Sequence, residues 1–144
     1  MTNTIGFLIN DAARLFRRML DGNIRDLGMT SVQWRTVARL NHDPGMRQAE
    51  LADLLDVEPI TLSRMIDRLV ESGMVCRKPD PTDRRAWNLY LTDTAKPLLD
   101  ELASEADKVV EISMTGLDAD EREQLSSLVE RVRANLSRRE AVDA

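Results

Sequence analysis

Apolar residues recur at steps of three and four along most of the chain, which is the spacing of amphipathic α-helices. The first such run predicts a helix over residues 5–20, and Gly28 breaks the pattern. A second helix is expected to begin at Thr30, because Gln33 can complete a capping box, and to end at the turn "DPG" of residues 43–45. The apolar faces comprise Ile5, Leu8, Ile9, Ala12, Leu15, Phe16, Met19 and Leu20 in the first helix and Val32, Val37 and Leu40 in the second.

Two shorter helical patterns follow between residues 46 and 74, separated by the break "DVEP". Pro59 lies in the first turn of the second pattern, where its missing N–H costs little, and Gly73 ends that helix. Two helices joined by a short turn are typical of a helix-turn-helix, whose second helix enters the DNA major groove. Helical bundles that bind no nucleic acid show the same pattern, so this segment alone leaves both readings open. The first helix holds Leu51, Ala52, Leu54 and Leu55, and the second is expected to direct Ile60, Met65, Ile66, Leu69 and Val70 inward.

The segments "MVCRKP" and "AWNLYLT" alternate apolar and polar residues and are predicted to form two strands, joined by "DPTDRR". A helix-turn-helix followed directly by a hairpin describes a winged helix, whose hairpin tip can reach a neighbouring minor groove. The tip carries Arg84 and Arg85, and a guanidinium suits the negative potential of a narrow minor groove. We expect Asp83 to hold the Arg85 side chain in one orientation. The alternative is a solvated hairpin whose charges only keep the chain soluble.

The chain has a net charge of −5, but its acidic excess lies towards the C-terminus. Residues 91–144 carry 7 basic and 13 acidic side chains, whereas residues 31–90 carry 9 of each. The overall negative charge therefore does not exclude an anionic partner, which would have to contact the middle of the chain.

The composition argues against an enzyme and against a metal site. The chain of 144 residues has one histidine, His42, one cysteine, Cys76, and no Gly-rich phosphate loop, so neither a Ser-His-Asp set nor a cysteine-rich zinc site can be assembled. We expect no catalytic residue, cofactor or metal. No apolar run approaches the roughly 18 residues of a membrane span, and no signal peptide is evident, so a cytoplasmic protein without membrane contact is predicted.

The segment "ELADLLDVEPITLSRMIDRLVESGMVCRKPDPTDRRAWNLYLT" resembles the MarR family of bacterial transcriptional regulators. The family pattern has a Leu-Ala helix, a recognition helix, a Leu-x-x-x-Gly-hydrophobic-Val ending, a wing with Asp-x-Arg at its tip, and Leu-Thr afterwards. The resemblance extends over almost the whole chain. Ala95, where Gly is commoner, and "SVQW" at residues 31–34 are most similar to the SlyA-like branch. The matching residues are Leu51, Ala52, Leu69, Gly73, Val75, Asp83, Arg85, Leu91 and Thr92.

This resemblance implies a single MarR-type domain over residues 1–144, mainly α-helical with a small β-hairpin wing. The winged-helix DNA-binding core would span residues 31–91. Residues 1–28 and 92–140 would form dimerisation helices that interlock two chains.

The pattern after the wing agrees with this organisation. It predicts one helix from Thr92 to about Thr115 and another that Asp118 caps, with Glu121 three residues on. Both lie outside the winged-helix core, and their apolar faces need a cover. One alternative is that these faces pack on the core of the same chain. We favour the other, in which a second copy of the chain covers them. The apolar positions are Leu98, Leu102, Ala106, Val109, Val110 and Met114, and then Leu125, Leu128, Val129, Val132 and Leu136.

The resemblance also implies a sequence-specific regulator that binds double-stranded DNA, expected to be a repressor acting as a homodimer on a palindromic operator. The alternative is a winged-helix module that contacts proteins without sequence-specific DNA binding; an acidic wing tip would favour it, and the two tip arginines argue against it. The residues expected to contact DNA are Thr61, Ser63, Arg64 and Arg68 on the recognition helix and Asp83, Arg84 and Arg85 on the wing.

Relatives in this family bind small aromatic carboxylates between the dimer helices and the DNA-binding body, which implies an aromatic or phenolic acid as effector. Such a pocket needs an apolar wall and a cation. For Trp34 the alternative role is a core residue that fixes its helix to the winged-helix body. The residues expected to line the pocket are Phe16, Arg17, Met19, Trp34 and Val37, with Arg18 as a second candidate for the cation.

Overall fold

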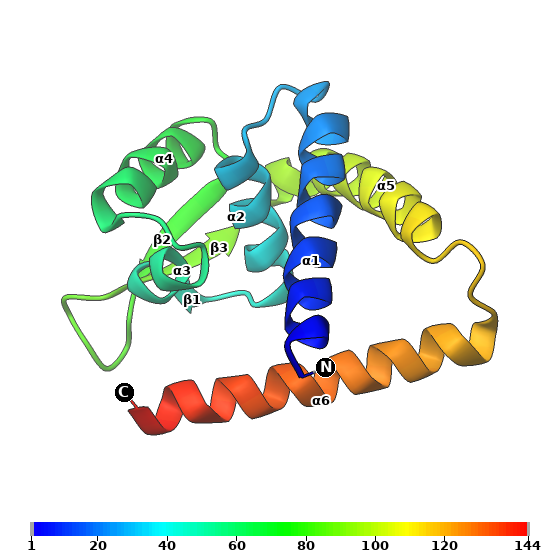
Figure 1. Ribbon diagram of the computed structural model, residues 1–144. Helices are drawn as coiled ribbons and strands as arrows, with labels where there is room; N and C mark the ends of the chain where they lie inside the picture. Colours follow the sequence, from blue (N-terminus) through cyan, green and yellow to red (C-terminus); the bar gives the residue numbers. More distant parts are fainter. Residues whose placement is uncertain (1, 144) are drawn as a thin grey trace. The chain divides into compact units, whose positions relative to one another are not determined.

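The structure, a computed structural model, describes residues 2–143 (Figure 1). The chain divides into two compact units, Met1–Val109 and Val110–Ala144. No helix in the described part of the chain is long and apolar enough to cross a membrane.

The fold is mainly α-helical with one small antiparallel sheet, as the sequence predicted, and the winged-helix elements occur in the expected order. The elements are α1 (Thr2–Arg25), α2 (Ser31–His42), β1 (Met46–Arg47), α3 (Gln48–Leu54), α4 (Pro59–Glu71), β2 (Val75–Pro79), β3 (Trp87–Leu91), the 3-10 helix η1 (Asp93–Ala95), α5 (Lys96–Ser113) and α6 (Ala119–Asp143).

Both predicted capping boxes are present. The Thr30 hydroxyl accepts a hydrogen bond from the Gln33 backbone N–H at 3.2 Å, and the Gln33 side chain accepts one from the Thr30 N–H at 2.8 Å. At the start of α6, Asp118 and Glu121 exchange the same two bonds at 2.8 and 3.0 Å. These bonds satisfy N–H groups that a helix start leaves without partners, and they therefore determine where α2 and α6 begin.

The sheet has three strands rather than the predicted two, in the order β1–β3–β2. The additional strand, β1, is only two residues long and shows no alternation that a sequence pattern could detect. Gly45 precedes it with φ +83° and donates its N–H to the Leu89 carbonyl at 2.9 Å, so the glycine brings β1 alongside β3. In the hairpin, β2 and β3 pair from Val75 opposite Leu91 to Pro79 opposite Trp87.

The first core cluster lies between α2, α3, α4 and the sheet. The prediction for α4 needs correction: Ile60 is 61% exposed and Val70 37% exposed, whereas Leu62 is fully buried. The buried stripe of α4 runs opposite Ile60, because a helix turns by about 100° per residue. The members of the cluster are Leu40, Leu51, Ala52, Leu55, Leu62, Met65, Ile66, Leu69, Val75 and Leu89.

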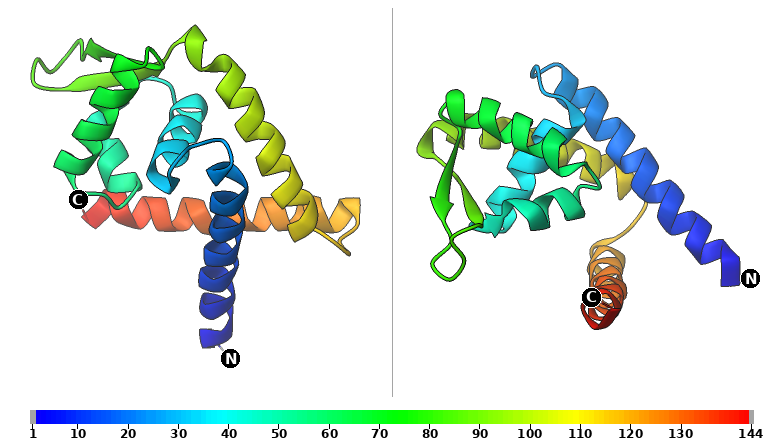
Figure 2. Two further views of the ribbon diagram at one scale, coloured as in Figure 1. Left: turned by 90° about the horizontal axis from the view of Figure 1, so that it is seen from above. Right: turned by 90° about the vertical axis from the view of Figure 1, so that its left-hand side faces the viewer.

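The second core cluster joins the C-terminal half of α1 to α2 and α5, and consists of Leu20, Ile24, Val37, Leu102 and Val109. Only part of the predicted apolar face of α1 packs here. The first half of α1 extends away from the winged-helix body in both views of Figure 2, and its apolar side chains are exposed. In the first half these are Ile5, Phe7, Leu8 and Ile9, and Leu15 and Met19 further along α1 are exposed too; within the second unit, the exposed residues of α6 are Leu125, Leu128, Val129, Val132 and Leu136.

Candidate nucleic-acid interface

The exposed face of α4 carries the polar residues predicted from the sequence. Thr61, Arg64 and Arg68 are exposed and Ser63 is half-buried. α4 begins with Pro59 at its first position and ends before Gly73, whose φ is +79°. It therefore has the expected length. Sequence reasoning missed one residue of this face, because Ile60 was placed in the core.

Arg77, on β2, ties α4 to the wing, and sequence reasoning did not single it out. Its guanidinium pairs with Asp67 of α4 at 2.6 Å and donates to the Ser63 carbonyl at 3.3 Å and to the Gln48 side chain of α3 at 3.2 Å. Only 23% of the Arg77 side chain is exposed. These three bonds fix α3, α4 and β2 relative to one another, so Arg77 holds α4 and the wing in one geometry.

The wing begins with a second anchor, Asp80. One of its carboxylate oxygens accepts hydrogen bonds from the backbone N–H and hydroxyl of Thr82, both at 2.8 Å, and the other accepts one from Arg47 of β1 at 3.0 Å. The bonds from Thr82, and then the one from Arg47, hold the pKa of Asp80 well below its usual range. Asp80 is therefore ionised at neutral pH and orders the start of the loop.

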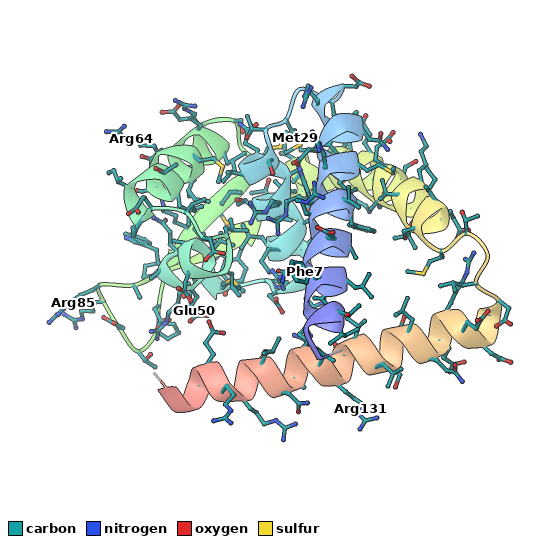
Figure 3. All side chains as sticks on the ribbon, viewed as in Figure 1. Phe7, Met29, Glu50, Arg64, Arg85 and Arg131 are labelled. Carbon is teal, nitrogen blue, oxygen red and sulfur yellow. The ribbon has the colours of Figure 1, made fainter. Side chains whose placement is uncertain are left out.

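The role predicted for Asp83 also needs correction. Its carboxylate accepts a hydrogen bond from the backbone N–H of Arg85 at 2.9 Å, and its carbonyl accepts one from the Ala86 N–H at 3.1 Å. Asp83 therefore shapes the turn, while within residues 2–143 no ion pair holds the guanidinium of Arg84 or Arg85. Figure 3 shows Arg64 on α4 and Arg85 at the loop tip, both projecting outward.

A cavity of about 590 Å³ lies in the first unit between α1, α2 and α3. Three of the predicted ligand residues, Phe16, Arg17 and Trp34, line it. The other two lie elsewhere: Val37 is fully buried in the second core cluster, and Met19 is 41% exposed on α1. The complete lining is Ala13, Phe16, Arg17, Leu20, Trp34, Arg35, Ala38, Arg39, His42, Leu54 and Leu55.

The cavity combines apolar walls with three guanidinium groups. Arg35 donates a hydrogen bond to the carbonyl of Leu55, the C-cap residue of α3, at 3.1 Å. Burial, together with the charge of Arg17, lowers the pKa of Arg35. Arg39 is paired with Asp43 at 3.4 Å, whereas no described carboxylate pairs with Arg17. An anion in the cavity would therefore relieve the repulsion between Arg17 and Arg35.

The family model described as MarR matches residues 29–87, which contain α2, α3, α4 and the hairpin loop. Proteins of this family are transcription regulators and not enzymes.

Solved structures extend the similarity to almost the whole chain. The transcriptional regulator PA3341 is 32% identical, with 93% of this chain and 98% of that chain covered and a TM-score of 0.78. A MarR transcriptional regulator from Methanosarcina mazei is 26% identical, with coverages of 96% and 92% and a TM-score of 0.79. The transcriptional regulator SlyA is 27% identical, with coverages of 93% and 94% and a TM-score of 0.73. The helix-turn-helix, the wing and the helices around them are thus shared with these regulators, and the chain belongs to the MarR family.

Proposed function

We propose that this protein is a sequence-specific transcriptional regulator that binds double-stranded DNA. In this proposal α4 enters a major groove through Thr61, Ser63, Arg64 and Arg68, and the wing places Arg84 and Arg85 in the adjacent minor groove, with Asp83 shaping the tip.

The observation that supports the proposal most directly is the charge of this surface. Among the described residues, Arg64, Arg68, Arg84 and Arg85 have no carboxylate partner, although the chain as a whole is acidic. Two of the acidic groups nearby are paired, Asp67 with Arg77 and Asp80 with Arg47, while Asp83 at the tip accepts hydrogen bonds from backbone N–H groups. An exposed surface that offers unpaired guanidinium groups on a helix and a neighbouring loop suits a phosphate-rich duplex.

The proposal includes a homodimer acting on a palindromic operator. Residues 31–91 would form the DNA-binding core, and residues 1–28 and 92–140 the dimerisation helices, whose exposed apolar side chains on α1 and α6 a second copy would cover. Two recognition helices would then contact half-sites about 34 Å apart, one turn of the DNA helix. The bound dimer would act in the cytoplasm as a repressor.

A small aromatic or phenolic acid is proposed to release the repressor by binding the cavity between α1, α2 and α3. Phe16 and Trp34 supply an apolar wall, and Arg17 and Arg35 supply cations that form no salt bridge among the described residues, although the charges of Asp21 and Asp56 act on Arg35. Such a ligand changes DNA affinity only if it binds the DNA-free conformation more tightly than the DNA-bound one.

Fluorescence anisotropy with the DNA upstream of the protein's own coding sequence tests the proposal. The wild-type protein should bind this duplex more tightly than a scrambled duplex of equal length. Arg64→Ala should weaken binding, whereas Arg25→Ala, which removes an exposed arginine at the end of α1, should leave it unchanged. If neither duplex binds at low salt, the winged helix serves another purpose.

The alternative, a protein-interaction module, predicts a different result. Such a module would bind both duplexes equally or not at all, and Arg64→Ala and Arg25→Ala would behave alike. The unpaired arginines of α4 and the wing favour the DNA-binding proposal over this alternative.

A further inference from the structure

Trp87 is an exposed aromatic residue in a chain that contains only 3% aromatic residues. It is the first residue of β3, pairs with Pro79 of β2, and is 47% exposed. Side chains alternate along a strand, so Trp87 lies on the same face of β3 as Leu89, which is fully buried in the first core cluster. The indole therefore lies on the core-facing side of the hairpin, at the end of β3 that extends past the first core cluster.

A hollow of about 260 Å³ lies beside the indole and is lined by Gln48, Ser63, Asp67, Arg77 and Trp87. It connects α4, which carries Ser63 and Asp67, with the base of the wing. The guanidinium of Arg77 is already used, because it bonds to all three of the other polar lining residues. The indole N–H of Trp87, by contrast, has no hydrogen-bond partner within residues 2–143.

We infer that Trp87 contacts the sugar–phosphate backbone that runs between the major groove occupied by α4 and the minor groove occupied by the wing. The inference rests on the proposed DNA binding. The indole face would pack on a deoxyribose while the Nε1–H donates to a phosphate oxygen. Backbone contacts of this kind set the register of a protein on the duplex and carry no base information.

The charges around the hollow suit a phosphate. Asp67 is the only carboxylate among its lining residues, and Arg77 compensates its charge at 2.6 Å. The unpaired cations of Arg64 on α4 and of Arg84 and Arg85 on the wing lie on the two elements that flank the hollow. A backbone that contacts both elements must pass over the hollow between them, and Trp87 offers it an uncharged donor.

Tryptophan fluorescence tests the contact without knowledge of the operator, because a backbone contact forms on any sequence. The probe is a random-sequence duplex at low salt, and the protein is Trp34→Phe, in which Trp87 is the only tryptophan. Saturating DNA should change the Trp87 emission and protect it from quenching by acrylamide, which is uncharged and is not repelled by DNA. If Trp34→Phe does not fold, the difference between wild type and Trp87→Phe gives the same signal.

Affinity measurements separate the two parts of the contact. Trp87→Ala should weaken binding to the random duplex and to the upstream fragment alike, by roughly tenfold for each protomer, and Trp87→Phe by a smaller factor because it loses only the N–H. The salt dependence of binding should stay as in wild type, since a neutral donor releases no counterion. Thermal unfolding of both variants checks that they remain folded.

The outcomes distinguish this inference from the proposed function. If wild type binds no duplex, the proposed function itself fails. If wild type binds, while Trp87 remains as accessible to acrylamide in the complex as in the free protein and Trp87→Ala binds equally well, the contact does not exist. A loss confined to the upstream fragment would also overturn the inference, because it would make Trp87 a reader of base sequence.

Discussion

The indole N–H of Trp34 donates a hydrogen bond to the carboxylate of Asp21 at 2.6 Å and thereby joins α2 of the winged helix to α1. Trp34 also packs against the second core cluster and lines the cavity beside Arg17. The two roles considered for this residue, core and pocket wall, are therefore compatible. A ligand in the cavity would act directly on the junction between the winged-helix body and α1.

The first prediction concerns this junction. In a Trp87→Phe background, in which Trp34 is the only tryptophan, salicylate should quench the tryptophan fluorescence and weaken DNA binding over the same concentration range, because one binding event causes both effects. Arg17→Ala should shift both curves to higher concentrations, since it removes a cation of the cavity. If a panel of aromatic acids leaves both signals unchanged up to millimolar concentrations, Trp34 is only a core residue.

Arg85 is expected to be the main DNA contact of the wing. Arg85→Ala should stay folded and dimeric and lose on the order of 1–3 kcal/mol of binding free energy for each half-site. The dependence of affinity on salt should flatten, because fewer counterions are released. Binding titrations at several salt concentrations measure both effects, with Arg25→Ala as the matched control. An affinity equal to that of wild type would show that Arg85 of the wing makes no DNA contact.

Replacing Gly45 with any other residue is predicted to lower the unfolding free energy. A Cβ there would lie 2.9 Å from the Tyr90 hydroxyl and 3.1 Å from the ring carbon that bears it, and the φ of +83° is unfavourable for any side chain. Gly28 provides a matched control, with φ +79° and nothing within 4 Å of such a Cβ. Gly28→Ala should cost about 1–2 kcal/mol of unfolding free energy from the backbone alone. Gly45→Ala should cost more, and equal costs in urea unfolding would show that the ring moves aside freely.

Asp80 is predicted to make stability depend on acidic pH. Its pKa is depressed in the folded state, so its contribution is fully present above the unfolded pKa, about 4, and is lost as pH falls through the lower folded value. The difference in unfolding free energy between wild type and Asp80→Asn should thus be constant near neutral pH and shrink below about pH 4. Denaturant unfolding at a series of pH values measures this difference. A difference that grows on acidification would contradict the assignment.

Features that depend on neighbours in the sequence were predictable. The capping boxes of Thr30 and Asp118 each involve residues three apart, and Pro59 and Gly73 limit α4 through their own backbone preferences. These constraints act locally, so they can be recognised before any tertiary contact is known.

Features that depend on tertiary contact were not predictable in the same way. Ile60 was expected in the core because it is apolar, but the core side of α4 is determined by what packs against Leu62 and Ile66. The pair between Arg77 and Asp67 joins two elements, and nothing in the spacing of the two residues selects them as partners. The predicted order of helices and strands was therefore more accurate than the predicted side-chain contacts.

The last prediction concerns the homodimer. The exposed apolar residues of α6, among them Leu128 at 54% and Val132 at 42%, are unfavourable in water, and completing their burial contributes for each a fraction of the roughly 1.5–3 kcal/mol that full burial of an exposed side chain gives. Light scattering at micromolar concentration should therefore give the mass of two chains. Leu128→Glu combined with Val132→Glu should give the mass of one chain, because charges in an apolar interface are costly to bury. Ser127→Glu, an exposed polar position on the same helix, is the control and should remain dimeric. A wild-type protein with the mass of a single chain would exclude the dimer, and with it the pairing of two recognition helices on a palindrome.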